Sequence, residues 1–142
     1  MIMALPHGTV PKRIWVNGCF DIIHRGHIEL LKYAKSLGGY DSVLFVGIDS
    51  DEKVKRDKGD RRPFNKLEDR IAVLSTIRPV DFVYSFDSRQ GLEDLIKSIH
   101  PDIMVVGEEY RTKGVVGSQY AEKVEFFKRI PGHSTTRILE KK

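Results

Sequence analysis

Cysteine is almost absent from this 142-residue chain, which contains only Cys19. A single thiol excludes a disulfide within the chain and fits a reducing compartment, so we expect a cytoplasmic protein. Because Cys19 stands in a predicted turn, we interpret it as a packing residue rather than as a nucleophile.

Long apolar runs are missing as well. No stretch approaches the roughly 20 apolar residues that a membrane-spanning helix needs, so we expect no membrane segment. The first ten residues contain Pro6 and Gly8 and lack the basic start and apolar stretch of a signal peptide. We interpret residues 1–10 as a flexible tail and residues 11–142 as one domain.

A strong excess of charge of one sign is also absent, because 24 Lys and Arg residues oppose 20 Asp and Glu residues. The basic residues are not interleaved with aromatic residues on one obvious face, which is the pattern of nucleic-acid-binding modules. A small polyphosphate substrate would explain the net charge of +4 equally well. We therefore expect no nucleic acid as partner, and we keep a basic nucleic-acid-binding module as an alternative.

Short apolar runs alternate with segments of helical spacing along the chain. We expect strands at about 13–16, 42–48, 81–86, 103–106 and 124–130. We expect helices at about 26–37, 66–77 and 92–99, with shorter ones within 49–63 and near 118–123 and a final one that opens at about residues 132–136. Gly38 and Gly39 end the first helix, and Asn65 is the expected cap of the helix that begins near Lys66.

This alternation predicts an α/β fold, a doubly wound parallel sheet of about five strands with right-handed crossovers. The strand order would be 3-2-1-4-5 in a single domain. Strands one and four are then neighbours at the switch point, and ligands bind beyond the carboxyl ends of the strands there.

The segment from Asn17 to His27 joins the first strand to the first helix through a tight turn. A helix N-terminus offers free N–H groups and the positive end of the helix dipole, which together favour phosphates. His24 and His27 are three residues apart and share a face, while Gly26 lets a ligand approach the backbone. We expect both imidazoles to converge with backbone amides on one anionic group. The alternative is a helix start with two incidental, solvated histidines.

A charged segment, residues 49–63, follows the second strand. Lys55, Lys58 and Arg62 come after the end of this strand, on the side of a parallel sheet where ligands bind. We expect them to contact phosphates, although a solvated helix and loop would also explain the charges.

Four motifs resemble those of the nucleotidylyltransferase (cytidylyltransferase-like) family. His24-Arg25-Gly26-His27 resembles the family's His-x-Gly-His motif, and Gly18-Cys19-Phe20-Asp21 is similar to the segment before it. Gly107-Glu108-Glu109-Tyr110 and Ser134-Thr135-Thr136-Arg137-Ile138 resemble two later motifs. The resemblance covers the chain from Arg13 onward and is strongest to the nucleotidylyltransferase domain of ADP-heptose synthase, as in Lys58-Gly59-Asp60-Arg61-Arg62-Pro63.

The resemblance implies a role for each matching residue. Catalytic roles fall to His24, His27 and Lys55. Nucleotide binding falls to Asn17, Gly18, Cys19, Phe20, Gly26, Lys58, Gly107, Glu108, Ser134, Thr135 and Thr136. Acceptor binding falls, more weakly, to Asp21, Arg62, Arg78, Glu109 and Tyr110.

The implied reaction is nucleotidyl transfer from a nucleoside triphosphate, accompanied by Mg²⁺, to a small phosphorylated acceptor. We expect ATP and a sugar 1-phosphate of the heptose type, in a homodimer. Arg78-Pro79-Val80-Asp81 instead resembles glycerol-3-phosphate cytidylyltransferase, so CTP with a polyol phosphate is the alternative. A second alternative is a sensor that binds a nucleotide without turning it over. We expect no all-protein metal site.

Overall fold

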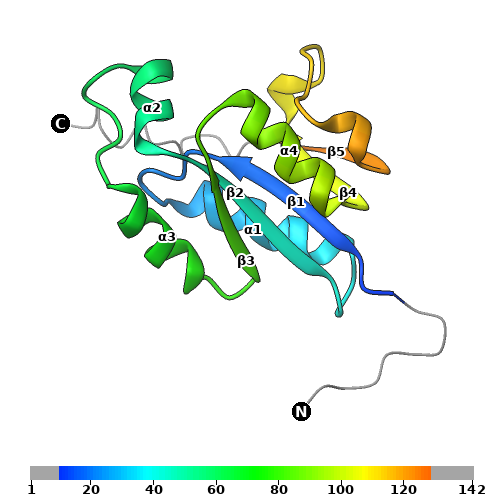
Figure 1. The fold of residues 1–142 in the computed structure, drawn as a ribbon. Helices are drawn as coiled ribbons and strands as arrows, with labels where there is room; N and C mark the ends of the chain where they lie inside the picture. The colour runs from blue at the N-terminus through cyan, green and yellow to red at the C-terminus, as the bar shows by residue number, and fades with distance from the viewer. Residues whose placement is uncertain (1–9, 129–142) are drawn as a thin grey trace.

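Five parallel strands form the centre of the protein. In the computed structural model, which describes residues 10–128, they lie in the order β3-β2-β1-β4-β5 (Figure 1). Their bounds are β1 Arg13–Gly18, β2 Val43–Asp49, β3 Phe82–Phe86, β4 Ile103–Gly107 and β5 Lys123–Phe127. The predicted α/β class, the single domain and the order 3-2-1-4-5 are therefore confirmed.

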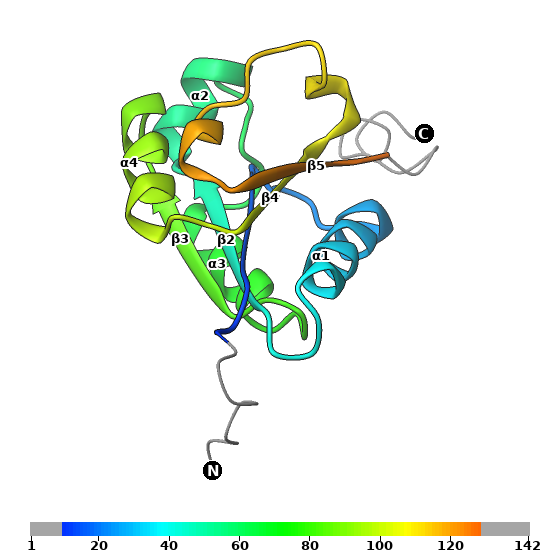
Figure 2. The same ribbon diagram turned by 90° about the vertical axis from the view of Figure 1, so that its right-hand side faces the viewer.

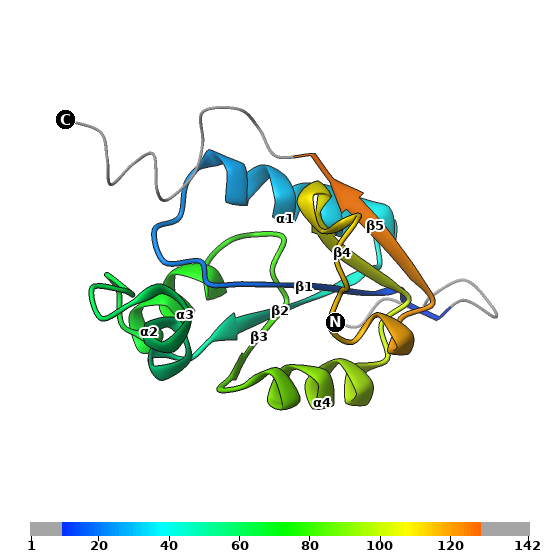
Figure 3. The same cartoon turned by 90° about the horizontal axis from the view of Figure 1, so that it is seen from above.

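Helices cover both faces of this sheet, with α1 and α4 on opposite sides (Figures 2 and 3). The helices are α1 Arg25–Leu37, α2 Asp51–Lys58, α3 Leu67–Ser75 and α4 Arg89–Ile99, with short 3-10 helices η1 Glu108–Tyr110 and η2 Ser118–Tyr120. The expected helix at 118–123 is thus a single 3-10 turn, since β5 already begins at Lys123.

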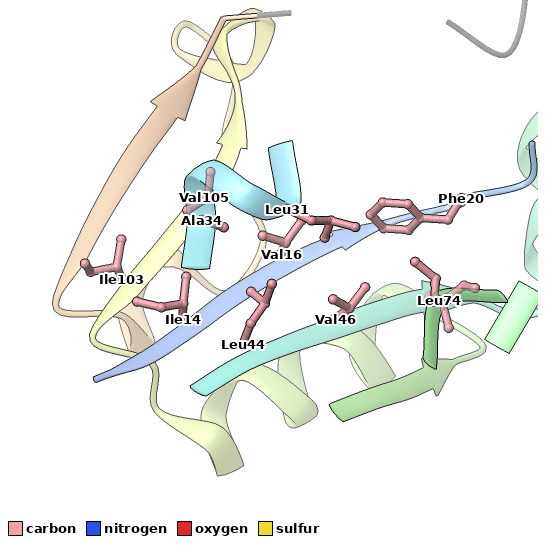
Figure 4. Packing of buried hydrophobic residues seen from close by; sticks show 11 residues of the cluster. Ile14, Val16, Phe20, Leu31, Ala34, Leu44, Val46, Leu74, Ile103 and Val105 are labelled. Carbon is pink, nitrogen blue, oxygen red and sulfur yellow. The ribbon is translucent and has the colours of Figure 1, made fainter. Parts of the chain in front are cut away.

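One core lies between the sheet and helices α1 and α3. Leu31 and Ala34 of α1 and Leu74 of α3 pack on apolar side chains of β1 and β2, such as Val16 and Leu44 (Figure 4). All five side chains are at most 1% exposed. Burying an aliphatic side chain contributes about 1.5–3 kcal/mol, so this layer fixes α1, and with it the helix N-terminus.

The other core lies under α4, where Ile96 and Leu92 pack against Trp15 and Met104. Gly47 of β2 lies beneath the indole: a Cβ at this position would be 2.4 Å from Cζ2 of Trp15. The Trp15 indole N–H donates to Oδ1 of Asn17 at 2.8 Å, so the buried ring keeps its hydrogen bond. Both sheet faces are therefore covered, as the nearly continuous apolar run of β2 predicts.

One predicted helix cap is wrong. Helix α3 begins at Leu67, with Lys66 at the N-cap position and no side-chain cap bond. Asn65 does not cap it, because its side-chain amide donates instead to the carbonyl oxygen of Asp21 at 2.6 Å. A hydrogen bond to a residue distant in the sequence therefore takes the place of the predicted cap bond to the helix N-terminus. The predicted end of α1 at Gly38 is confirmed.

Some predictions fall outside the described residues. These are the tail before residue 10, the far end of the fifth strand, the final helix and the motif Ser134-Thr135-Thr136. The division into residues 1–10 and 11–142 therefore stays a prediction. Within residues 10–128, none of the helices has the length and apolar character needed to cross a membrane.

Candidate active site

Three loops meet at the carboxyl edge of the sheet. They follow β1, β2 and β4, and the arrowhead of β1 points toward α2 in Figure 1. Because β1 pairs in parallel with both β2 and β4, the segments after Gly18, Asp49 and Gly107 leave neighbouring strands at the same edge. The switch point predicted from the sequence is therefore present.

The two histidines close the N-terminus of α1. Nδ1 of His24, the N-cap residue, accepts the N–H of Gly26 at 3.0 Å, and Nδ1 of His27 accepts the N–H of His24 at 3.2 Å. The two ring planes are inclined by 30°, with centroids 3.9 Å apart. The pair thus replaces the Ser and Glu of a usual capping box.

These bonds fix the tautomer of both rings. An Nδ1 atom that accepts a backbone N–H carries no proton, so a neutral ring carries its proton on Nε2. Each histidine can then donate a hydrogen bond from Nε2 to an anion. The amides of His24 and Gly26 are already bonded to the rings, so we consider the imidazoles, rather than these two amides, as donors to an anion at this helix start.

Phe20 shapes the turn before the histidines. Its backbone has φ of 49°, a left-handed conformation that non-glycine residues seldom adopt. The Phe20 side chain is 3% exposed and its ring lies 5.1 Å from that of His27. A buried aromatic ring thereby supports one face of the catalytic candidate, and strained backbone of this kind is frequent at functional sites.

Cys19 lies in the same turn. Burial raises the pKa of its thiol, while the charges of Lys58 and Arg70 oppose this shift. A raised pKa keeps the thiol protonated at neutral pH, which agrees with a packing role and argues against a nucleophile. The electrostatic effect of Lys58 on Cys19 also shows that the end of α2 lies beside this turn.

Arg70 is the residue that the sequence analysis missed. Its side chain is fully buried and joins three loops of the site. The guanidinium donates to the carbonyl oxygens of Cys19 at 3.0 Å, Asp49 at 2.7 Å and Asn65 at 3.0 Å, and to Oδ1 of Asp51 at 2.7 Å. The signal was an arginine three residues after Leu67 and four before Leu74, at the spacing of the buried stripe.

Asp21 binds the loop of residues 62–65 to the turn before the histidines. Its carboxylate, 1% exposed, accepts the backbone N–H groups of Phe64 and Asn65, both at 2.8 Å, and Nε–H of Arg62 at 3.3 Å. Asp21 and Arg62 are therefore brought together, but the Asp21 carboxylate is engaged with this loop rather than open to an acceptor.

Helix α2 separates the basic residues of its segment into two groups. Lys53 is tied to Asp49 at 3.0 Å and to Asp57 at 2.6 Å. Although burial acts to lower it, these hydrogen bonds raise the pKa of Lys53 and hold it as a structural cation. Lys55 and Lys58 are exposed and three residues apart, so they share a different face of α2.

The loop after β4 carries the acidic motif. Gly107 ends the strand, and a Cβ there would lie 2.5–2.6 Å from both carboxylate oxygens of Glu109, so the glycine makes room for this side chain. Glu108 and Tyr110 are exposed, and the ammonium of Lys113 lies 5.7 Å from the Tyr110 ring centroid. The structure thus brings this motif to the same edge as the histidines.

Arg78 is not brought to this site. It precedes β3, and residues before a parallel strand lie at the amino-terminal edge, opposite the histidines. The next carboxylate, Asp81, shows the same placement, because it binds the N–H of Leu44 near the start of β2 at 2.7 Å. Within one chain, an acceptor bound at the histidines is therefore remote from Arg78.

Comparisons with known proteins agree with this geometry. The model of the cytidylyltransferase-like family matches residues 15–141. The bifunctional protein HldE of Helicobacter hepaticus is 45% identical over 91% of this chain and 26% of the relative. HldE of Nitratiruptor sp. is 46% identical over 95% of this chain and 28% of the relative. The chain spans about a quarter of the length of these curated relatives.

Solved structures have the same fold. A crystal structure of the lipopolysaccharide core biosynthesis protein from Thermoplasma volcanium matches with a TM-score of 0.64 at 25% identity, covering 84% of this chain and 96% of that chain. Pantoate-beta-alanine ligase from Francisella tularensis matches with a TM-score of 0.59 at 17% identity, covering 86% and 61%. The second likeness supports the fold alone.

Proposed function

The chain belongs to the cytidylyltransferase-like family, and we propose that it transfers a nucleoside monophosphate from a nucleoside triphosphate to a phosphorylated acceptor. The observation that carries this proposal is the histidine pair at the start of α1, with Nδ1 of both rings bonded to backbone N–H groups. Two imidazoles that donate from Nε2 at a helix N-terminus suit a phosphate whose charge grows during the reaction.

In the proposed reaction, a phosphate oxygen of the acceptor attacks the α-phosphorus in line with the leaving pyrophosphate. The new P–O bond forms as the bond to pyrophosphate breaks, so no protein nucleophile is required. His24 and His27 stabilise charge on the α-phosphate, and Lys55 and Lys58 supply further positive charge that stabilises the transition state. Catalysis is then a matter of positioning and charge stabilisation.

The proposed donor is ATP, and the proposed acceptor is a sugar 1-phosphate of the heptose type. Two observations support this choice: the 45–46% identity to proteins named HldE, and the resemblance of residues 58–63 to ADP-heptose synthase. CTP with glycerol 3-phosphate or a related polyol phosphate is the second candidate, because Arg78-Pro79-Val80-Asp81 resembles that family of cytidylyltransferases.

Mg²⁺ belongs to the proposed reaction as part of the substrate, since a nucleoside triphosphate carries it on its phosphate oxygens. Among residues 10–128, no three His, Cys, Asp or Glu side chains come together in a way that could hold a metal. The homodimer, the cytoplasmic location and the absence of nucleic-acid and membrane partners stay predictions.

A substrate matrix tests the proposed function. ATP and CTP are each combined with heptose 1-phosphate, other sugar 1-phosphates and glycerol 3-phosphate, and pyrophosphate release is measured. We expect turnover with ATP and the heptose 1-phosphate. Turnover only with CTP would transfer the assignment to the second candidate. Triphosphate binding without pyrophosphate release in any combination would make the chain a nucleotide sensor.

The two faces of α2 give a further prediction. Lys55→Ala and Lys58→Ala should each lower kcat/KM for the triphosphate at least about tenfold, because each removes a cation proposed to bind phosphate. Since both side chains are exposed, the free energy of unfolding should change by no more than about 0.5 kcal/mol. Pyrophosphate release at subsaturating triphosphate and thermal melts measure the two effects.

Lys53→Ala is the matched control for this pair. Its ammonium is paired with Asp49 and Asp57, so Lys53→Ala should lower the free energy of unfolding by about 1 kcal/mol. We expect its kcat/KM for the triphosphate to fall less than that of the Lys55 and Lys58 variants. Full activity of both the Lys55 and the Lys58 variant would mean that this face of α2 is only solvated.

A further inference from the structure

Phe64 is an exposed aromatic residue on a firmly held loop. Its side chain is 61% exposed. Its backbone N–H donates to the buried Asp21 carboxylate at 2.8 Å, and the next residue, Asn65, is held by Asp21 and by Arg70. Because buried Asp21 and Arg70 hold the backbone of this loop, the Phe64 ring is exposed to solvent at a defined position.

The position of the loop relates Phe64 to the reaction centre. Asp21, to which the loop is bonded, precedes His24 by three residues in the same turn. The loop follows α2 and so belongs to the β2 side of β1, whereas Glu108 and the loop after β4 lie on the other side. The loop of Phe64 is therefore bonded to the same turn that leads to the histidines.

Positively charged residues near Phe64 indicate which chemical class of ligand would bind there. Arg61 and Arg62 come directly before Pro63, and Arg61 is exposed. Among these cations the aromatic ring offers an apolar face whose π-electrons attract the weakly positive C–H groups of a sugar ring. An anion that carries a ring fits this combination better than a simple phosphate does.

We propose that Phe64 is a specificity residue of the acceptor site, whose ring stacks on the C–H face of a sugar 1-phosphate held by the neighbouring cations. This inference rests on the proposed nucleotidyl transfer and deepens it. In-line transfer requires the attacking oxygen and the leaving pyrophosphate on opposite sides of the α-phosphorus. Phe64 lies on the loop that is bonded to Asp21, three residues before His24, so an acceptor stacked on its ring can approach the α-phosphorus held at the histidines.

The kinetic test compares Phe64→Ala, Phe64→Leu and Phe64→Trp. We expect Phe64→Ala to raise the KM of the sugar phosphate about tenfold, with the KM of the triphosphate and kcat within about twofold of the wild type. Phe64→Trp should restore the acceptor KM, whereas Phe64→Leu, which keeps apolar area without a ring, should not. A merely structural role would not separate the two KM values in this way.

Tyr40→Ala is the matched control, because Tyr40 is also an exposed aromatic residue, 92% exposed, but lies between α1 and β2 at the opposite edge of the sheet. Its acceptor KM should equal that of the wild type. An acceptor KM that is unchanged in Phe64→Ala, or a triphosphate KM that rises with it, would overturn the inference.

A binding measurement decides the inference without turnover. In proton NMR, mannose 1-phosphate added to the wild-type chain should show upfield ring-current shifts of its sugar protons, and Phe64→Ala and Phe64→Leu should abolish them. Inorganic phosphate serves as the ring-free probe and should compete. Unshifted sugar protons with the wild type, or equal shifts with Phe64→Ala, would overturn the stacking. Shifts without pyrophosphate release would contradict the proposed reaction alone.

Discussion

Replacing either His24 or His27 with alanine should lower kcat by about 10²–10³. Each imidazole is placed to donate from Nε2 to an oxygen whose negative charge increases in the transition state, and removal of one such donor typically has this cost. Pyrophosphate release at saturating substrates measures the loss. Because the proposed effect is on the transition state, the KM of the triphosphate should change much less than kcat.

Alanine also removes the caps of α1, so a second pair of variants is needed. Asn is a favourable N-cap residue and Gln completes a capping box, so His24→Asn and His27→Gln keep a side-chain acceptor for the backbone N–H groups. The alanine variants should lose about 1 kcal/mol of stability through the missing cap. The Asn and Gln variants should recover most of this stability and still lack activity.

The four variants together separate the two roles of the histidines. Activity that returns along with stability in His24→Asn or His27→Gln would mean that the rings only cap the helix. Near wild-type turnover in the alanine variants would remove both residues from the catalytic assignment.

The order of the strands and the place of the site could be predicted from the sequence because they depend on local patterns. The nearly continuous apolar run within 42–48 predicts a strand covered on both faces, and the spacing of Leu31 and Ala34 predicts the buried side of α1. Strand–helix alternation then leaves few topologies, since crossovers are right-handed. The histidine pair could be found because its two members belong to one helical turn.

The remainder of the site depends on contacts between distant segments. The Asp21 carboxylate binds backbone N–H groups more than 40 residues away, and no local pattern marks Phe64 or Asn65 as its partners. For the same reason the local pattern predicts Asn65 as a helix cap, whereas its side chain binds the carbonyl oxygen of Asp21. Backbone groups of any residue type can fill such a role, so side-chain identity carries little information about it.

Arg70 joins these distant segments, and its replacement should produce the largest loss of stability. In Arg70→Met the volume is nearly kept, but the carbonyl oxygens of Cys19, Asp49 and Asn65 lose their donor, and Asp51 loses its cation. Removing one partner of a buried ion pair costs about 3–5 kcal/mol. Asp51 is 29% exposed and water can solvate it in part, so the loss of unfolding free energy should lie toward the lower end of this range.

Urea denaturation of Arg70→Met against the wild type measures this loss. Arg70→Lys should remain well below the wild type, because an ammonium has three donors on one atom and cannot match a planar guanidinium that reaches four acceptors. Arg25→Met is the matched control: that side chain is 72% exposed, and its only ion pair within the described chain is a 3.9 Å contact to Glu29. Its loss should cost less than about 0.5 kcal/mol. If Arg70→Met were as stable as Arg25→Met, the loops after β1 and β2 would be held by their own packing and the buried guanidinium would be dispensable to the site.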